Sequence, residues 1–145
     1  HCTDIMRGGV ELAELDADAW NASYRDARIT MVAAIDPALH WGVDAAHVNG
    51  LLDDLQLIAL GTGEDRLLAT DFSATGSGFA ALVPHAKIVE IAPANHFSAL
   101  LSCKPIGPAI LEEEGEPPVC DDPAGADRDQ IHSQIIDQIA GQLGL

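Results

Sequence analysis

The fold that this sequence predicts is decided by the stretch Leu55-Gln-Leu-Ile-Ala-Leu-Gly-Thr-Gly-Glu-Asp65, an apolar run that stops at glycines and then presents an acid. A second run with the same layout, Lys87-Ile-Val-Glu-Ile-Ala-Pro-Ala-Asn-His96, ends in a histidine. Short apolar runs bounded by turn residues are typical of buried strands. Because loops at the carboxyl ends of neighbouring parallel strands converge on one edge of a sheet, we expect Asp65 and His96 to meet there.

The rest of the chain alternates between strand-like and helix-like patterns. We expect strands over 28–35, 55–60 and 87–91, the first buried on both faces, and helices over 10–24, 44–52, 71–83 and 127–143. This alternation predicts an α/β domain with a parallel sheet. One domain would comprise an opening loop and helix (1–26), the strands with their acid and histidine loops (27–103), a loop (104–126) and a closing helix (127–145).

The first predicted strand is apolar and would lie at an edge of the sheet. An uncovered apolar edge invites pairing with another strand. We therefore expect further strands to come from an upstream segment of the polypeptide or from a separate chain.

Composition excludes several partners and cofactors. The chain has 145 residues, with 23 Asp plus Glu against 7 Lys plus Arg and a formal charge of −16. Such a balance repels nucleic-acid phosphates and anionic membrane surfaces, and no apolar run reaches the ~18 residues of a membrane span.

The six histidines have no companions at metal-site spacing, so we expect no catalytic metal and no cofactor. A calcium site at the run of three glutamates, 112–114, has little support.

Cys103 and Cys120 flank a segment rich in Pro, Gly and Glu. A disulfide between them would stabilise this segment by roughly 3 kcal/mol in the chain-entropy model, and would favour a periplasmic or secreted protein over a cytoplasmic one. Two unpaired thiols in a reducing compartment are the alternative. Cys2 would then be left to pair outside these residues.

His96 has the residue type and position of a general base, because imidazole takes up a proton near neutral pH. The alternative is a surface histidine in a turn. Asp65 ranks first as the acid that orients it, since the glycines before it leave the carboxylate free to turn; Asp36 ranks second and Glu64 third.

Aromatic residues near these loops could form a substrate pocket. His40, Trp41 and Phe97 are candidates to line an acyl or leaving-group pocket, with ordinary packing as the alternative. His132 is expected to be a hydrogen-bonded helix residue, and His47 and His85 surface residues.

Taken in order, these motifs resemble the C-terminal part of an α/β-hydrolase over residues 27–142. The matching pieces are Asp-Pro-Ala (36–38), Gly-Thr-Gly-Glu-Asp (61–65), Pro-His-Ala-Lys (84–87) and Ala-Asn-His-Phe (94–97). Within that superfamily the chain looks most like the predicted dienelactone hydrolases and their platelet-activating-factor acetylhydrolase relatives. The two cysteines after His96 and the final Asp-Arg-x-x-Ile-His helix (127–132) are similar to that group.

This resemblance implies a serine-type hydrolase of small esters or lactones, in which His96 and Asp65 assist an upstream serine. No Gly-x-Ser-x-Gly occurs in these residues, so the nucleophile and the oxyanion amides are expected upstream. A cysteine nucleophile is disfavoured, because Cys2 is too near the terminus and the other two cysteines follow His96. The alternative from a different class is a non-catalytic module that binds a partner through its open sheet edge.

Overall fold

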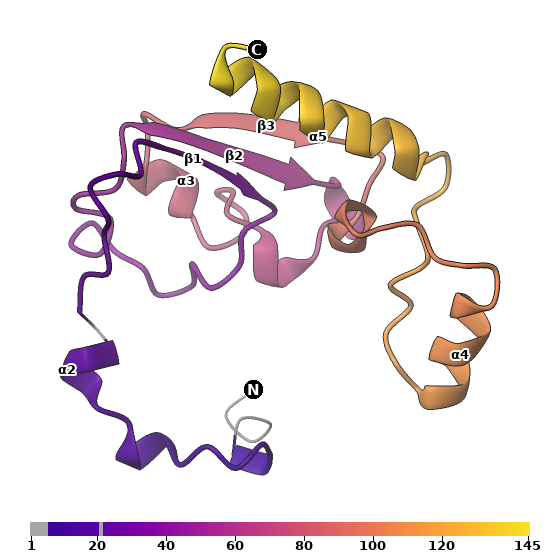
Figure 1. The fold of residues 1–145 in the computed structure, drawn as a ribbon, viewed down its shortest axis with the longest axis horizontal. Helices are drawn as coiled ribbons and strands as arrows, with labels where there is room; N and C mark the ends of the chain where they lie inside the picture. The colour runs from indigo at the N-terminus through magenta and orange to yellow at the C-terminus, as the bar shows by residue number, and fades with distance from the viewer. Residues whose placement is uncertain (1–5, 21) are drawn as a thin grey trace.

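The computed structural model describes residues 6–20 and 22–145 and has a small α/β fold (Figure 1). Its sheet consists of three parallel strands in the order β1 (Met31–Ile35), β2 (Asp54–Leu60) and β3 (Lys87–Ile91). The parallel sheet with flanking helices confirms the coarser part of the fold prediction, an α/β domain with a parallel sheet. The strand positions also agree with the sequence, although β1 begins three residues later than the predicted range of 28–35.

The central strand β2 forms the middle of the core. Its six residues 55–60 are buried, because β1 and β3 pair with its two edges and helices or loops cover its two faces. Alternate side chains of a strand point to opposite faces. Ile58 and Leu60 therefore belong to one hydrophobic cluster, while Leu55, Leu57 and Ala59 belong to another.

Helix α5 (Arg128–Leu143) covers the first of these faces (Figure 1). Asp127 caps its N-terminus by accepting a hydrogen bond from the Gln130 N–H at 3.1 Å, and Gly144 ends it with a left-handed backbone. Ile131 and Ile135 are buried against the sheet, as their i, i+4 spacing predicted. Full burial of one such side chain stabilises a fold by about 1.5–3 kcal/mol.

The second face is covered by α3 (Phe79–Leu82) and the loop that carries Phe72. The prediction of a helix over 71–83 is wrong for most of that range. A Cβ at Gly76 would lie 2.0 Å from the carbonyl oxygen of Asp71, so the chain turns back on itself there. Asp71 accepts a hydrogen bond from the Ser73 N–H instead of capping a helix.

Two other predictions need correction. Residues 44–52 form turns without a helix. The predicted loop 104–126 contains the helix α4 (Gly107–Glu114), which begins with Pro108 in its first turn and ends at Gly115. Proline is favoured at the start of a helix and glycine just after its end, so this sequence signal was present.

In the part of the chain that the structure describes, no strand of the N-terminal segment pairs with the outer edge of β1. The short elements of this segment, a 3₁₀ turn (Leu12–Glu14) and α2 (Ala17–Trp20), replace most of the predicted helix 10–24. The segment runs away from the sheet (Figure 1), and its described residues before Asn21 whose burial is defined are all exposed. Val32 and Ile35 are 36% and 37% exposed, so β1 is not buried on both faces as predicted. Cys2 lies outside the described residues.

Candidate active site

Asp36 and His96 form a hydrogen-bonded pair at the carboxyl edge of the sheet. Nδ1 of His96 lies 2.7 Å from Oδ2 of Asp36. Asp36 directly follows β1, and His96 is the first residue of a 3₁₀ turn that comes after β3. The Asp36 side chain is 1% exposed and the His96 side chain is 36% exposed. A buried acid therefore supports an imidazole that solvent can reach.

Asp36 is held by two hydrogen bonds to β2 besides its contact with His96. Its backbone has a φ of +43°, a left-handed conformation that Asp tolerates better than most residues. Its N–H donates to the carbonyl of Ile58 at 2.7 Å, and its Oδ1 accepts from the N–H of Leu60 at 2.9 Å. The side chain thus continues the β1–β2 ladder where the backbone has turned away. Such over-determined, sparsely populated backbone is frequent at functional sites.

His96 opens the 3₁₀ turn His96–Ala99, which Asn95 caps. Oδ1 of Asn95 accepts from the N–H groups of Phe97 and Ser98 at 2.9 and 3.1 Å, and Oγ of Ser98 accepts from the Asn95 N–H at 2.9 Å. This reciprocal arrangement is a capping box. The imidazole packs edge-on against the ring of Phe97, with centroids 5.4 Å apart.

This geometry determines how the pair can act. With Asp36 as a carboxylate, which only accepts hydrogen bonds, Nδ1 of His96 is the donor in this pair and Nε2 presents a lone pair. Nε2 has no hydrogen-bond partner within residues 6–20 and 22–145. An imidazole in this state can accept a proton at Nε2, and the buried carboxylate stabilises the resulting cation.

Asp65 is exposed in the 3₁₀ turn Gly63–Asp65, and its side chain forms no hydrogen bond or ion pair with the described residues. The structure therefore brings Asp36, the second-ranked acid, to Nδ1 of His96 in place of Asp65. Asp65 and Glu64 instead line a cavity of about 270 Å³ that also contacts His96 and Phe97. They lie at the mouth of the candidate site.

Two of the three predicted pocket residues, Phe97 and His40, line cavities, and these cavities are different. Phe97 lines the cavity next to His96, whereas His40 lines a separate apolar cavity of about 240 Å³ behind the Asp36 loop. His40 is 5% exposed and packs among the rings of Phe72 and Phe79, and the Trp41 ring lies 6.4 Å from it and is half exposed. His40 and Trp41 thus contribute nothing to the cavity at His96.

Three further histidines of the described residues, His47, His85 and His132, are not among the residues that line the cavity at His96. Nε2 of His132 donates to the carbonyls of Ser98 and Leu100 at 3.0 and 3.1 Å, which ties α5 to the His96 turn. His47 and His85 are exposed, as predicted. Among the described residues no three His, Cys, Asp or Glu side chains are grouped as a metal site, and none of their helices is long and apolar enough to cross a membrane.

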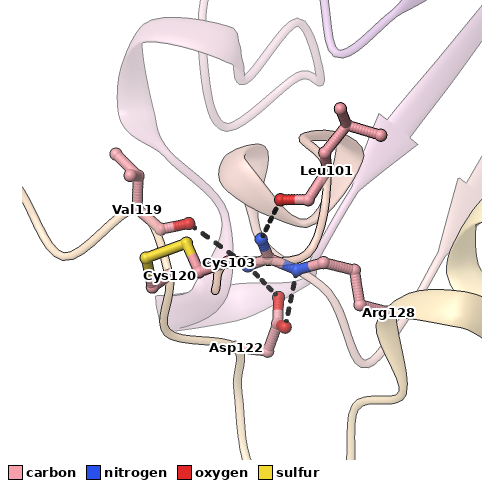
Figure 2. Close-up of a disulfide and its surroundings, with 6 residues drawn as sticks. All are labelled: Leu101, Cys103, Val119, Cys120, Asp122 and Arg128. Atoms are coloured by element: carbon pink, nitrogen blue, oxygen red, sulfur yellow. Dashed lines mark hydrogen bonds and ion pairs between the residues drawn. A yellow bond between two sulfur atoms is a disulfide. The ribbon is translucent and has the colours of Figure 1, made fainter. Parts of the chain in front are cut away.

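A disulfide and an ion pair support the segment after His96 (Figure 2). Cys103 and Cys120 are bonded, which confirms the predicted pairing. Arg128 is 8% exposed and binds Asp122 through Nε and Nη2 at 2.8 and 3.0 Å. Burial opposes ionisation of Asp122, but hydrogen bonds from Arg128 and Ser98 and the charge of Arg128 outweigh it, so the pKa of Asp122 lies below its usual value.

Asn95, Ser98 and Asp122 were not singled out by the sequence. The signal for Asn95 and Ser98 is their spacing, because a capping box places the two residues three apart. Asp122 lies in an irregular loop and carries no local signal. No protein-family model matches this chain, and no curated protein or solved structure matches it significantly.

Proposed function

We propose that this chain supplies the general base and the orienting acid of a serine-type carboxylic ester hydrolase, with the nucleophile located outside these 145 residues. The observation that carries the proposal is the 2.7 Å hydrogen bond between buried Asp36 and partly exposed His96. A carboxylate bonded to Nδ1 of a histidine whose Nε2 is unpaired matches two members of a hydrolytic triad, which supports the proposal. Asp36 takes the role of the acid.

The open edge of β1 supports one place for the proposed nucleophile. The N–H of Asp36 points toward β2, so the intervening backbone groups of β1 at Ala33 and Ile35 point away from it. A further parallel strand paired there would lie about 4.8 Å from β1 and end at the same edge as Asp36. A serine in the turn after that strand would face His96. The sequence resemblance to α/β-hydrolases independently favours this order, so the sheet would be the last part of a larger one.

The cavity beside His96 indicates the class of substrate. Its volume of about 270 Å³ suits the acyl or alcohol part of a small ester or lactone. Three acids, Glu64, Asp65 and Asp121, line it against one cation, Arg66, which is already paired with Glu90, and the whole chain carries −16. Strongly anionic substrates are therefore disfavoured by charge repulsion.

A serine-directed fluorophosphonate probe tests this function. The tagged chain is produced in its native host and isolated with any polypeptide that accompanies it, either covalently or as a separate chain. We expect the probe to label one serine in that material and His96→Ala to abolish labelling, with His85→Ala as the matched control. Unchanged labelling in the His96 variant contradicts the proposal.

A second function rests on the same open edge. The apolar, half-exposed β1 could bind a partner by strand addition without any catalysis. In that case the isolated assembly carries no serine labelled by the fluorophosphonate, and His96→Ala leaves assembly unchanged.

A further inference from the structure

We propose that Asp122 is a positioning residue for His96, acting through the hydroxyl of Ser98. The proposal rests on the proposed function in one respect, namely that His96 is the base. Asp122 does not contact the imidazole of His96. It acts on the backbone turn to which His96 belongs.

The first step is the orientation of one buried hydroxyl. Ser98 is fully buried, and its Oγ lies 2.6 Å from Oδ1 of Asp122. Oδ1 of Asn95 is a second acceptor, 3.3 Å from the hydroxyl, but the contact with the charged carboxylate is much shorter. The single proton of Ser98 is therefore donated to Asp122, which leaves the oxygen lone pairs for other donors. One such donor is the N–H of Asn95, 2.9 Å away. Asp122 thus fixes the direction in which Ser98 accepts.

The second step leads from Ser98 to His96. Asn95 and Ser98 flank the first two residues of the turn, His96 and Phe97, and their reciprocal hydrogen bonds enclose His96. Nδ2 of Asn95 also donates to the carbonyl of Asp121 at 2.9 Å. Two consecutive residues of one loop therefore hold both ends of the capping box. The backbone of His96 has little freedom while these bonds persist.

The third step is the rigidity of Asp122 itself. Arg128 binds it through two nitrogens and also donates from Nη2 to the carbonyl of Val119 at 3.2 Å (Figure 2). Cys120, bonded to Cys103, lies between Val119 and Asp122 in the chain. Paired donors of this kind fix a carboxylate in direction as well as position. The disulfide loop and α5 together set where the Asp122 oxygens lie.

This arrangement matters because His96 must meet an acid that follows a different strand. Asp36 is fixed by β2, whereas His96 is fixed by the loop after Cys103 and by α5. A shift of about 0.5 Å is enough to disturb a catalytic hydrogen bond. Loss of the Ser98–Asp122 bond would let the turn relax and carry Nδ1 away from Asp36.

The test follows the tautomer of His96 by ¹⁵N NMR in the purified chain, at a pH where the ring is neutral. The wild type is expected to hold the Nδ1–H form. We expect Ser98→Ala and Asp122→Asn each to shift the ring toward the Nε2–H form, while the resonances of β2 remain dispersed. Ser133→Ala is the matched control, because its hydroxyl donates only to the Asp129 carbonyl within α5 and should leave the tautomer unchanged.

Retention of the wild-type tautomer in Ser98→Ala and Asp122→Asn overturns the proposal, even if both variants unfold at lower temperature. If Asp122→Asn does not fold, the tautomer of His96 in Ser98→Ala alone tests the proposal. The measurement requires no nucleophile, so an assembly without a labelled serine would reject the hydrolase function and leave this result standing.

Discussion

Oδ2 of Asp36 lies 2.7 Å from Nδ1 of His96, although sixty residues separate them in the chain. The strand between them, β2, makes this possible, because its Ile58 carbonyl and Leu60 N–H bind the backbone and side chain of Asp36. The acid is therefore part of the sheet as well as part of the site. Removal of the Asp36 carboxylate should therefore lower both the stability of the fold and the activity of the site.

Replacing Asp36 by alanine should lower the free energy of unfolding by about 1–3 kcal/mol, since the buried N–H of Leu60 loses its acceptor. Urea denaturation followed by circular dichroism measures this loss. Asp65→Ala is the control and should change stability by less than about 0.5 kcal/mol, because that exposed side chain has no partner among the described residues. Equal losses in the two variants would contradict the placement of Asp36.

Gly61 passes close to the segment before His96, with a φ of +77° and a virtual Cβ only 2.4 Å from the carbonyl oxygen of Ala94. Gly61→Ala should therefore destabilise the protein by at least about 1 kcal/mol, from strain and backbone displacement. The comparison is Gly141→Ala, which adds a methyl group in open space within α5 and should stabilise by about 0.4–1 kcal/mol. Thermal unfolding should show a lower melting temperature for Gly61→Ala and a higher one for Gly141→Ala than for the wild type.

The lowered pKa of Asp122 predicts a loss of stability in acid. Because the folded-state pKa is lower than that of an unfolded Asp, about 3.9, the unfolded chain binds the proton more tightly. The stabilisation is complete above that value and is lost as the pH falls through the folded-state pKa. Asp122→Asn should reduce the difference in unfolding free energy between pH 5 and pH 3. A difference as large as in the wild type would assign the acid sensitivity to other groups.

The register of β1 predicts opposite effects of proline at two neighbouring positions. The N–H of Ala34 faces β2, so Ala34→Pro removes a ladder hydrogen bond and should cost about 1–3 kcal/mol. The N–H of Ala33 points to the open edge, where proline is tolerated, so Ala33→Pro should cost less than about 1 kcal/mol. It should also reduce concentration-dependent association in sedimentation velocity. Equal destabilisation by the two prolines would refute this register.

The sequence predicted the sheet well because β2 and β3 are apolar runs bounded by turn residues, a pattern that requires no knowledge of distant contacts. The closing helix was equally accessible through Asp127 and the isoleucine spacing. Residues 71–83 were harder, since the tight approach of Gly76 to Asp71 competes with helix formation and has no simple periodic signal. Helix α4 carried its signal in Pro108 and Gly115, but its acidic, loop-like composition obscured it.

The candidate site was predictable only in part. His96 was identified from its place after β3, and Asp36 from its place after β1. The choice between Asp36 and Asp65 depended on backbone direction, because the left-handed turn at Asp36 points its carboxylate across β2. Sequence spacing does not encode that direction.

The central claim is that Asp36 and His96 act together on an ester, and it is tested most directly by the hydrolysis of 4-nitrophenyl acetate by the fluorophosphonate-reactive assembly. We predict that Asp36→Asn lowers kcat by about 10⁴-fold, the loss known for an orienting acid in a serine triad, while Asp65→Asn changes it by less than about tenfold. A large loss in Asp65→Asn with near-normal activity in Asp36→Asn would contradict the account.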